Sequence, residues 1–281
     1  MKIILFIFLF IQTLFAQPHL LTLLGDDAGY SAESQQYFDR LTDLPASDTL
    51  DAIATFIDGA NSDGVWSKID ECWLFANKTK TNAYVGMKGL KDCSESGTIT
   101  FSVYNHIVGN GSNGYLNTNF DPDVDGVNYT LNSGSFGVYS RNNVLEASID
   151  IGGRTTTDGG DQTWGAIRFT GDNFYAESNS DFLVQISNND SRGLFTISRT
   201  ASDLTTLYSN GTSFITSVAA SVDVFNGDIY ICALNEGGSP ANYSTRQYAF
   251  AFIGGGLTET DVGNLFNRLE TLLDFLGAGV E

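Results

Sequence analysis

The chain has 281 residues, a formal net charge of −19, three cysteines and two histidines. Its excess of Asp and Glu without a basic cluster argues against binding to a nucleic-acid backbone, which attracts basic surfaces. Three cysteines in a chain of this length do not form a disulfide scaffold, and the spacing of the cysteines and histidines matches no zinc pattern.

The N-terminus combines a basic start at Lys2 with an apolar run of about fourteen residues that ends at Ala16. An apolar segment this short is typical of a secretory signal peptide rather than of a membrane-spanning helix. We therefore predict a signal peptide over residues 1–16 and a secreted chain of residues 17–281 without membrane insertion, whose formal charge changes from −19 to −20 with the loss of Lys2. Leu14 is larger than the usual residue three positions before a cleavage point, which leaves an uncleaved anchor as the alternative.

Apolar residues recur at helical spacing from Ser31 onwards, and the pattern predicts three helices within residues 17–80. The first begins at Ser31, the second covers residues 48–59, and the third begins near Ser62 and carries apolar residues as far as Ala76. Their apolar stripes need a partner, and a sheet is the only predicted surface large enough to supply one. We expect this helical region to pack on the predicted sheet.

The apolar period changes to two at about Asn82 and persists to Ile253, which predicts an all-β region over residues 81–256. The 30 glycines and the many Asn, Ser and Thr residues fit a protein with many tight turns. The predicted strands cover residues 98–103, 115–118, 128–131, 136–140, 145–151, 166–169, 173–176 and 182–186, followed by a closing meander of antiparallel strands over residues 194–253.

The closing meander contains the hairpin sequence Tyr208-Ser209-Asn210-Gly211 and ends in an apolar strand over residues 248–253. This succession resembles the concanavalin A-like and laminin-G-like jelly rolls, in which a Tyr-x-Asn-Gly hairpin is a hallmark of the curved sheet. The resemblance implies a mainly β fold, a two-sheet antiparallel jelly-roll sandwich. It assigns no function, because lectins, glycosidases, lyases and adhesion modules share this fold.

The C-terminal segment, residues 257–281, returns to helical periodicity. Thr258 and Asp261 have the spacing of a capping box, and a wide apolar stripe follows as far as Leu276. We predict a C-terminal helix that packs on the sandwich or on the N-terminal helices. A helix that binds a partner is the alternative.

Four further motifs extend the resemblance beyond the jelly roll: residues 63–70, Trp73-Leu74-Phe75-Ala76, residues 84–89 and the run from Gly109 to Pro122. They resemble a largely uncharacterised group of proteins from tailed bacteriophages and bacteria, which join a helical N-terminal segment to the jelly roll and end in a helix. The likeness covers most of residues 35–276. It implies a virion-associated or surface-exposed protein without assigned catalytic residues, whereas the signal peptide favours a secreted bacterial product.

Glu146 and Asp150 are the nearest candidates for the catalytic carboxylates that glycosidases carry on this fold. Four residues of extended chain place them roughly 13 Å apart, which exceeds the roughly 5–9.5 Å of known carboxylate pairs. The strand motif Gln185-Ile186-Ser187 has serine where jelly-roll lyases carry histidine. We therefore expect a protein that is not an enzyme, and a polysaccharide-cleaving enzyme with a partner carboxylate from another strand is the alternative.

Asp121, Asp123 and Asp125 alternate along the chain before a glycine, a pattern that turns carboxylate oxygens toward one Ca²⁺ ion. The alternative is an acidic surface turn, because the ligand set is incomplete. Cys72 and Cys93 are the plausible disulfide pair, whereas Cys232 lies in an apolar strand and is expected to be buried.

Residues 152–175 combine aromatic side chains that can stack on sugar rings with polar side chains that can bind hydroxyls. A core tryptophan that covers one end of the sandwich explains Trp164 equally well. We predict a carbohydrate-binding or adhesion module whose partner is a glycan or cell-surface polysaccharide, and a homo-oligomer stays open. The alternative is a structural or receptor-binding component of a phage virion or another extracellular assembly. The candidate ligand-binding residues are Arg154, Asp158, Asp161, Gln162, Trp164, Asn173 and Tyr175.

Overall fold

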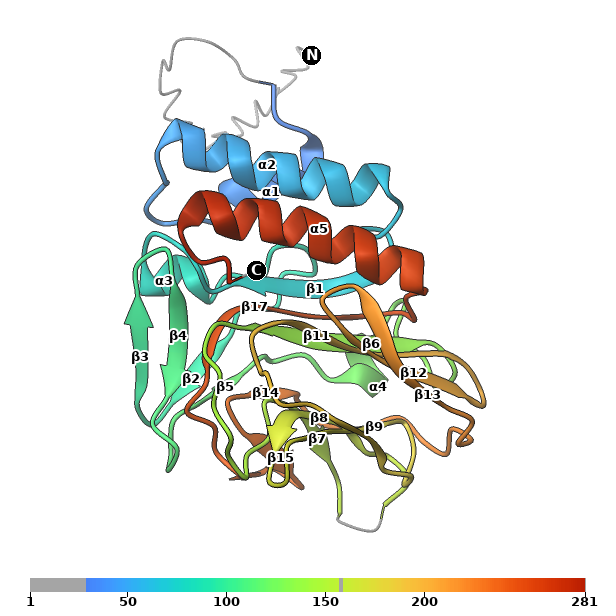
Figure 1. Ribbon diagram of the computed structural model, residues 1–281. Coiled ribbons are helices and arrows are strands. Elements are labelled where there is room, and N and C mark those ends of the chain that lie inside the picture. The colour runs from blue at the N-terminus through green and yellow to red at the C-terminus, as the bar shows by residue number, and fades with distance from the viewer. Residues whose placement is uncertain (1–28, 157–158, 281) are drawn as a thin grey trace, which may run out of the picture.

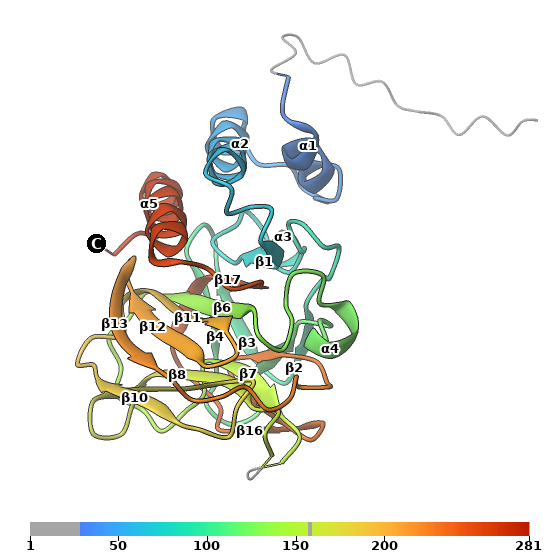
Figure 2. The ribbon, with the colours of Figure 1, turned by 90° about the vertical axis from the view of Figure 1, so that its right-hand side faces the viewer.

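The computed structural model describes residues 29–156 and 159–280. The predicted signal peptide, residues 1–16, and the candidate residue Asp158 lie outside the described residues. Two sheets pack face to face, and helices cover the outer face of one of them (Figure 1, Figure 2). This arrangement confirms the predicted mainly β sandwich with helices from both ends of the chain.

The first sheet, which we call the helix-covered sheet, has the strand order β13-β12-β11-β6-β17-β4-β3, and β1 pairs with β17 outside this order. Its neighbouring strands are antiparallel. The strands are β1 (Ile69–Leu74), β3 (Ile99–Ser102), β4 (His106–Gly109), β6 (Gly134–Ser140), β11 (Gly193–Ala201), β12 (Leu204–Ser209), β13 (Thr212–Ser217) and β17 (Gln247–Gly254).

The second sheet has the order β10-β9-β8-β7-β14-β5-β2, and the hairpin β15-β16 joins it through a short parallel pairing of β15 with β7. The remaining pairings are antiparallel. The strands are β2 (Ser94–Ser96), β5 (Tyr115–Asn117), β7 (Ile151–Arg154), β8 (Thr163–Phe169), β9 (Asn173–Ser178), β10 (Val184–Ser187), β14 (Tyr230–Ile231), β15 (Leu234–Glu236) and β16 (Ser239–Ala241).

The helices are α1 (Ala32–Phe38), α2 (Ser47–Ser62), α5 (Glu259–Leu276) and the single turns α3 (Lys80–Ala83) and α4 (Pro122–Asp125). The capping box predicted for the C-terminal helix is present, since Thr258 and Asp261 exchange hydrogen bonds with each other's backbone. Gly277, at φ 76°, ends this helix in the left-handed conformation that favours glycine. None of the described helices is long and apolar enough to cross a membrane.

Strand β17 belongs to two apolar cores at once. Phe250 and Phe252 face the helices, whereas Ala251 and Ile253 face the interior between the sheets. Because successive side chains of a strand point to opposite faces, a strand buried on both faces is apolar along its whole length. The outer face of the helix-covered sheet is therefore closed by α2 and α5, and no helix within residues 29–156 and 159–280 covers the outer face of the second sheet (Figure 2).

The third predicted helix is wrong, because residues 69–74 form strand β1 and pair with β17. Every residue of β1 is buried, so apolar residues are not restricted to alternate positions of the strand. Their spacing therefore fits a helix as well as a strand. A short apolar run of this kind cannot be assigned by periodicity alone. Residues 69–74 thus belong to the sheet although they fall within the predicted helical region.

Two predicted strands are also wrong over most of their length. Residues 128–131 make only an isolated bridge between Thr130 and Ser133, and the strand predicted over residues 145–151 begins only at Ile151. The backbone N–H groups of Asn128 and Tyr129 donate instead to the buried carboxylate of Asp70. A side chain from a distant strand therefore takes the place of a neighbouring strand, which the local sequence does not reveal.

The predicted disulfide is absent, because Cys72 and Cys93 are both free and buried. Cys72 lies in the core between the helices and the helix-covered sheet, whereas Cys93 lies in the core between the two sheets. The two thiols therefore belong to different apolar layers. Cys232 is buried, as predicted.

The predicted Tyr-x-Asn-Gly hairpin joins β12 to β13. Asn210 and Gly211 have φ values of 50° and 79°, which are the positive values that a type I′ turn requires at both central positions. The local sequence thus determines this turn.

Candidate functional site

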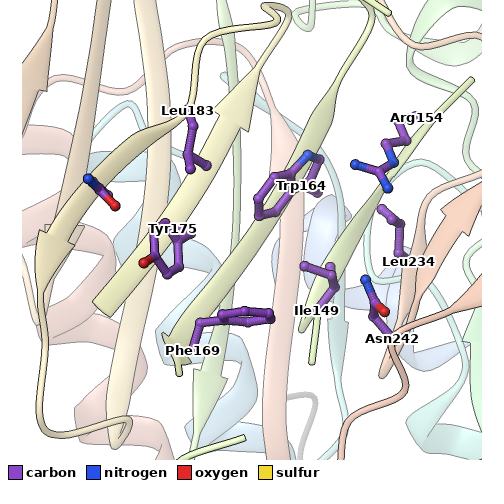
Figure 3. A pocket seen from close by; sticks show the side chains of 9 residues that line it. Ile149, Arg154, Trp164, Phe169, Tyr175, Leu183, Leu234 and Asn242 are labelled. Carbon is purple, nitrogen blue, oxygen red and sulfur yellow. The ribbon is translucent and has the colours of Figure 1, made fainter. Parts of the chain in front are cut away.

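The outer face of the second sheet contains a hollow of about 310 Å³ (Figure 3). Trp164 lies near its centre, with Tyr175 and Leu183 on one side and Arg154 and Leu234 on the other. We call it the sheet hollow, and its lining residues are Ile149, Arg154, Trp164, Phe169, Tyr175, Leu183, Gln185, Leu234 and Asn242.

The alternation of β8 and β9 presents the aromatic residues of the hollow. Ile167 of β8 and Phe174 of β9 point into the core between the sheets, so Trp164 and Tyr175 point outward. The rings of Phe169 and Tyr175 meet edge to face, with their centroids 5.6 Å apart. Trp164 is 9% exposed, because Leu234 and other apolar residues pack around it in a small cluster on the outer face. The tryptophan is therefore both a packed residue and a wall of the hollow.

Polar side chains at the edge of the hollow are joined by hydrogen bonds. The guanidinium of Arg154 donates to Glu236 through Nη2 at 2.7 Å and through Nε at 3.1 Å. Its Nη1 lies 3.4 Å from Oε1 of Gln162. The indole Nε1 of Trp164 lies 3.1 Å from the same Gln162 oxygen and 3.2 Å from Oε2 of Glu177. These contacts fix the orientation of Arg154 and Trp164.

Burial raises the pKa of the Glu177 carboxyl to about 7. The Trp164 N–H and the charge of Arg154 act in the opposite direction, and Asp181 raises the pKa further. Glu177 is 7% exposed and lies directly across the β8–β9 ladder from Trp164. A carboxyl group that bonds to Trp164, but does not itself line the hollow, therefore has a pKa raised toward neutral pH.

We expect Glu177→Gln to remove a pH-dependent loss of stability. The folded state binds the Glu177 proton more tightly than the unfolded chain, whose pKa is about 4.3. The contribution of the protonated Glu177 carboxyl to the stability of the folded state is thus complete below about pH 4 and is lost as the pH rises through about 7. At pH 8 the variant should exceed the parent in free energy of unfolding by about 1–2 kcal/mol, less than the full pKa shift implies because solvent screens the charge. Urea unfolding at both pH values measures the difference, and an equal difference at pH 4 and pH 8 would contradict the assignment.

The structure brings together three of the predicted ligand-binding residues, Arg154, Trp164 and Tyr175, and Gln162 bonds to two of them. Asn173 lies at the start of β9, where its amide donates to the Gly171 carbonyl, and it does not line the hollow. Asp161 also lies outside the lining.

Several lining residues were missed from the sequence. Gln185 follows the outward alternation of β10, so the strand pattern could have indicated it. Leu234 and Asn242 come from the β15–β16 hairpin and the segment after it, and no local signal connects that hairpin with Trp164. Glu177 and Glu236 do not line the hollow but bond to Trp164 and Arg154, and they are recognisable only through these partners in space.

The two carboxylates considered for glycosidase chemistry surround a buried arginine instead. Asp150 and Arg246 are fully buried, and Oδ1 of Asp150 lies 2.6 Å from Nη1 of Arg246. Oε1 of Glu146 lies 3.4 Å from the same nitrogen, and its carboxylate also accepts hydrogen bonds from Ser244 and Thr245. Neither Glu146 nor Asp150 lines the sheet hollow.

The three candidate calcium ligands do not converge. Asp121 caps the single turn α4, Asp123 accepts a hydrogen bond from Asn226, and Asp125 pairs with Lys91 at 2.7 Å. Within residues 29–156 and 159–280, no group of three His, Cys, Asp or Glu side chains is placed to hold a metal ion. Calcium binding elsewhere in the chain stays a prediction.

No protein-family model matches the chain, and no curated protein matches its sequence. Solved structures match its fold. One match is a structure of botulinum neurotoxin type C, whose cell entry depends on interaction with two ganglioside molecules. It has a TM-score of 0.53 and 14% identity, and the match covers 75% of this chain and 52% of that chain. The receptor-binding domain of the botulinum neurotoxin C/D mosaic serotype has a TM-score of 0.50 and 11% identity, and the match covers 72% and 51%.

A mutant Trypanosoma rangeli sialidase that displays trans-sialidase activity has a TM-score of 0.51 and 9% identity, with coverage of 83% of this chain and 40% of that chain. Each match thus spans about half or less of the length of the matched protein. Identities this low establish the shared architecture alone. The chain is a mainly β sandwich of two antiparallel sheets, and its fold neighbours include a botulinum neurotoxin receptor-binding domain.

Proposed function

We propose that the chain is a secreted carbohydrate-binding module without catalytic activity, and that the sheet hollow is its binding site. The observation that carries this proposal is the grouping of Trp164, Phe169 and Tyr175 around a depression on the sheet face that the helices leave uncovered. Aromatic rings stack on the apolar faces of sugars, and a few polar groups at the edge fix the orientation of a ligand.

Two further observations support the proposal. The amides of Gln185 and Asn242 lie in the lining and supply both donors and acceptors for hydroxyl groups. The fold neighbour botulinum neurotoxin type C depends on interaction with two ganglioside molecules for its cell entry. Gangliosides carry a glycan, so a glycan is a reasonable ligand for this architecture. The signal peptide predicted over residues 1–16 supports a location outside the cell.

The test is a glycan-array screen of the chain over residues 17–281, with Ca²⁺ and again with EDTA. We expect binding to a defined saccharide, and Tyr175→Ala should weaken it by about tenfold because one stacking surface is lost. Trp164→Phe should also weaken binding, since it removes the indole N–H that holds Glu177 and Gln162 in place. Loss of binding in EDTA would support the predicted calcium ion.

Phe275→Ala is the matched control, because this aromatic side chain is 52% exposed on α5, across the sandwich from the hollow. It should leave saccharide binding unchanged. Failure of the parent chain to bind any saccharide would overturn the proposal. The rival proposal, a structural or receptor-binding component of a virion or other assembly, would then be tested in purified particles.

A further inference from the structure

We propose that the sheet hollow selects uncharged saccharides and that Glu236 sets this selectivity by occupying the guanidinium of Arg154. The inference rests on the proposed function and adds the class of ligand. It starts from the charges at the edge of the hollow.

Arg154 is the one cationic side chain among the described residues that line the hollow. An arginine fork is the usual partner of a carboxylate ligand, because its parallel N–H groups match the two oxygens of the acid. In this structure the fork is already engaged by a carboxylate of the protein. Nη2 and Nε of Arg154 both donate to Oε1 of Glu236, and the side-chain exposures of 15% and 35% show that the pair is partly shielded from water.

The backbone holds this pair in place. Arg154 ends β7, Glu236 ends β15, and the two residues are direct partners in the parallel pairing of these strands. Direct pairing of the two strands thus places the two residues side by side. The remaining guanidinium nitrogen, Nη1, donates to Oε1 of Gln162, which also accepts a hydrogen bond from the indole N–H of Trp164. A ligand carboxylate would have to displace Glu236 from this arrangement.

The other ionisable groups near the hollow oppose an anionic ligand. Glu177 lies beside Trp164, and Asp181 lies close enough to raise the pKa of Glu177. Arg168, on the same strand as Trp164, is paired with Asp172 at 2.7 Å. The whole chain carries a formal charge of −19, which repels anions at long range. The lining otherwise offers aromatic faces and two amides, which suit neutral sugar rings and their hydroxyls.

The experiment uses paired probes: neutral oligosaccharides and, for each, the same oligosaccharide extended by one carboxylate sugar. The parent chain should prefer the neutral member of each pair. Glu236→Gln should strengthen binding of the carboxylate-bearing members by about tenfold, equivalent to about 1.4 kcal/mol, because the guanidinium becomes available. Binding of the neutral members should change by less than about twofold, since their stacking surfaces are unchanged.

Two further variants separate the local effect from a general change in charge. Asp63→Asn removes the same unit of negative charge from an arginine pair, Asp63–Arg268, on the helix layer. It should leave the preference for neutral members unchanged. The double variant Arg154→Gln/Glu236→Gln should lose the gain seen with Glu236→Gln alone. Thermal unfolding of each variant verifies that it is folded.

The outcomes distinguish this inference from the proposed function. Equal or tighter binding of the carboxylate-bearing probes by the parent chain overturns the inference and leaves the carbohydrate-binding function intact. A Glu236→Gln gain that survives the loss of Arg154, or that Asp63→Asn reproduces, also overturns it. Absence of binding to every probe overturns the proposed function, and this inference with it.

Discussion

Arg246→Met is expected to lower the free energy of unfolding by about 3–5 kcal/mol, because it leaves a buried carboxylate without its partner. Arg246 and Asp150 are both fully buried, and their charged atoms lie 2.6 Å apart. Burial opposes the charge on the guanidinium, but Asp150, Tyr248 and Glu146 outweigh burial and raise the pKa of Arg246. The same guanidinium donates to the Val144 carbonyl and so holds the segment before β7 in place.

A double-mutant cycle makes this prediction specific. Asp150→Asn alone should also be strongly destabilising, whereas Arg246→Met combined with Asp150→Asn should cost clearly less than the sum of the two single losses. Urea denaturation measures the four free energies of unfolding. Additive losses in the free energy of unfolding, or a loss below about 1 kcal/mol for Arg246→Met, would show that the Arg246–Asp150 pair does not stabilise the fold.

Phe250→Ala is expected to lower the free energy of unfolding by about 3–5 kcal/mol, the usual cost of deleting a buried phenylalanine. Phe250 is fully buried beneath the helices, where its ring contacts Phe56 of α2 at a centroid distance of 5.9 Å and Phe252 at 6.3 Å. The substitution opens a cavity in the layer that attaches the helices to the helix-covered sheet.

The control is Phe275→Ala, which deletes the same group from an exposed position of α5. It should change the free energy of unfolding by no more than about 0.5 kcal/mol. Urea denaturation followed by circular dichroism compares the two variants. Equal losses for the two substitutions would mean that the helices are not packed on the sheet through Phe250.

Local patterns in the sequence predicted the elements that neighbouring residues determine. The type I′ hairpin follows from Asn210-Gly211, because both residues tolerate a positive φ. The start of α5 follows from Thr258 and Asp261, whose side chains bond to backbone groups three residues away. The strand that carries Trp164 was predicted only over residues 166–169, so the shared face of Trp164 and Tyr175 emerged from the structure.

The predictions that were wrong depend on residues far apart in the sequence. The β1 segment reads as a helix because it is buried on both faces, and only its pairing with β17 decides its conformation. A disulfide between Cys72 and Cys93 was compatible with the sequence, but the two thiols lie in different apolar layers. Glu146 and Asp150 were assigned to a strand, whereas Arg246, about one hundred residues later in the chain, gathers them.

The sequence by itself determined the classes of element in this protein: an all-β region with a period of two residues, between helical segments with a period of 3.6 residues. The two-sheet sandwich was implied by the resemblance to jelly rolls. The tertiary structure decided which face stays uncovered and which charges meet there. Arg154 was a candidate ligand residue in the sequence, but its partner Glu236 is 82 residues away and reaches it only through the pairing of β15 with β7. The physical reason is range: capping, turns and alternation act between near neighbours, whereas an ion pair at the edge of a hollow depends on how distant strands pack.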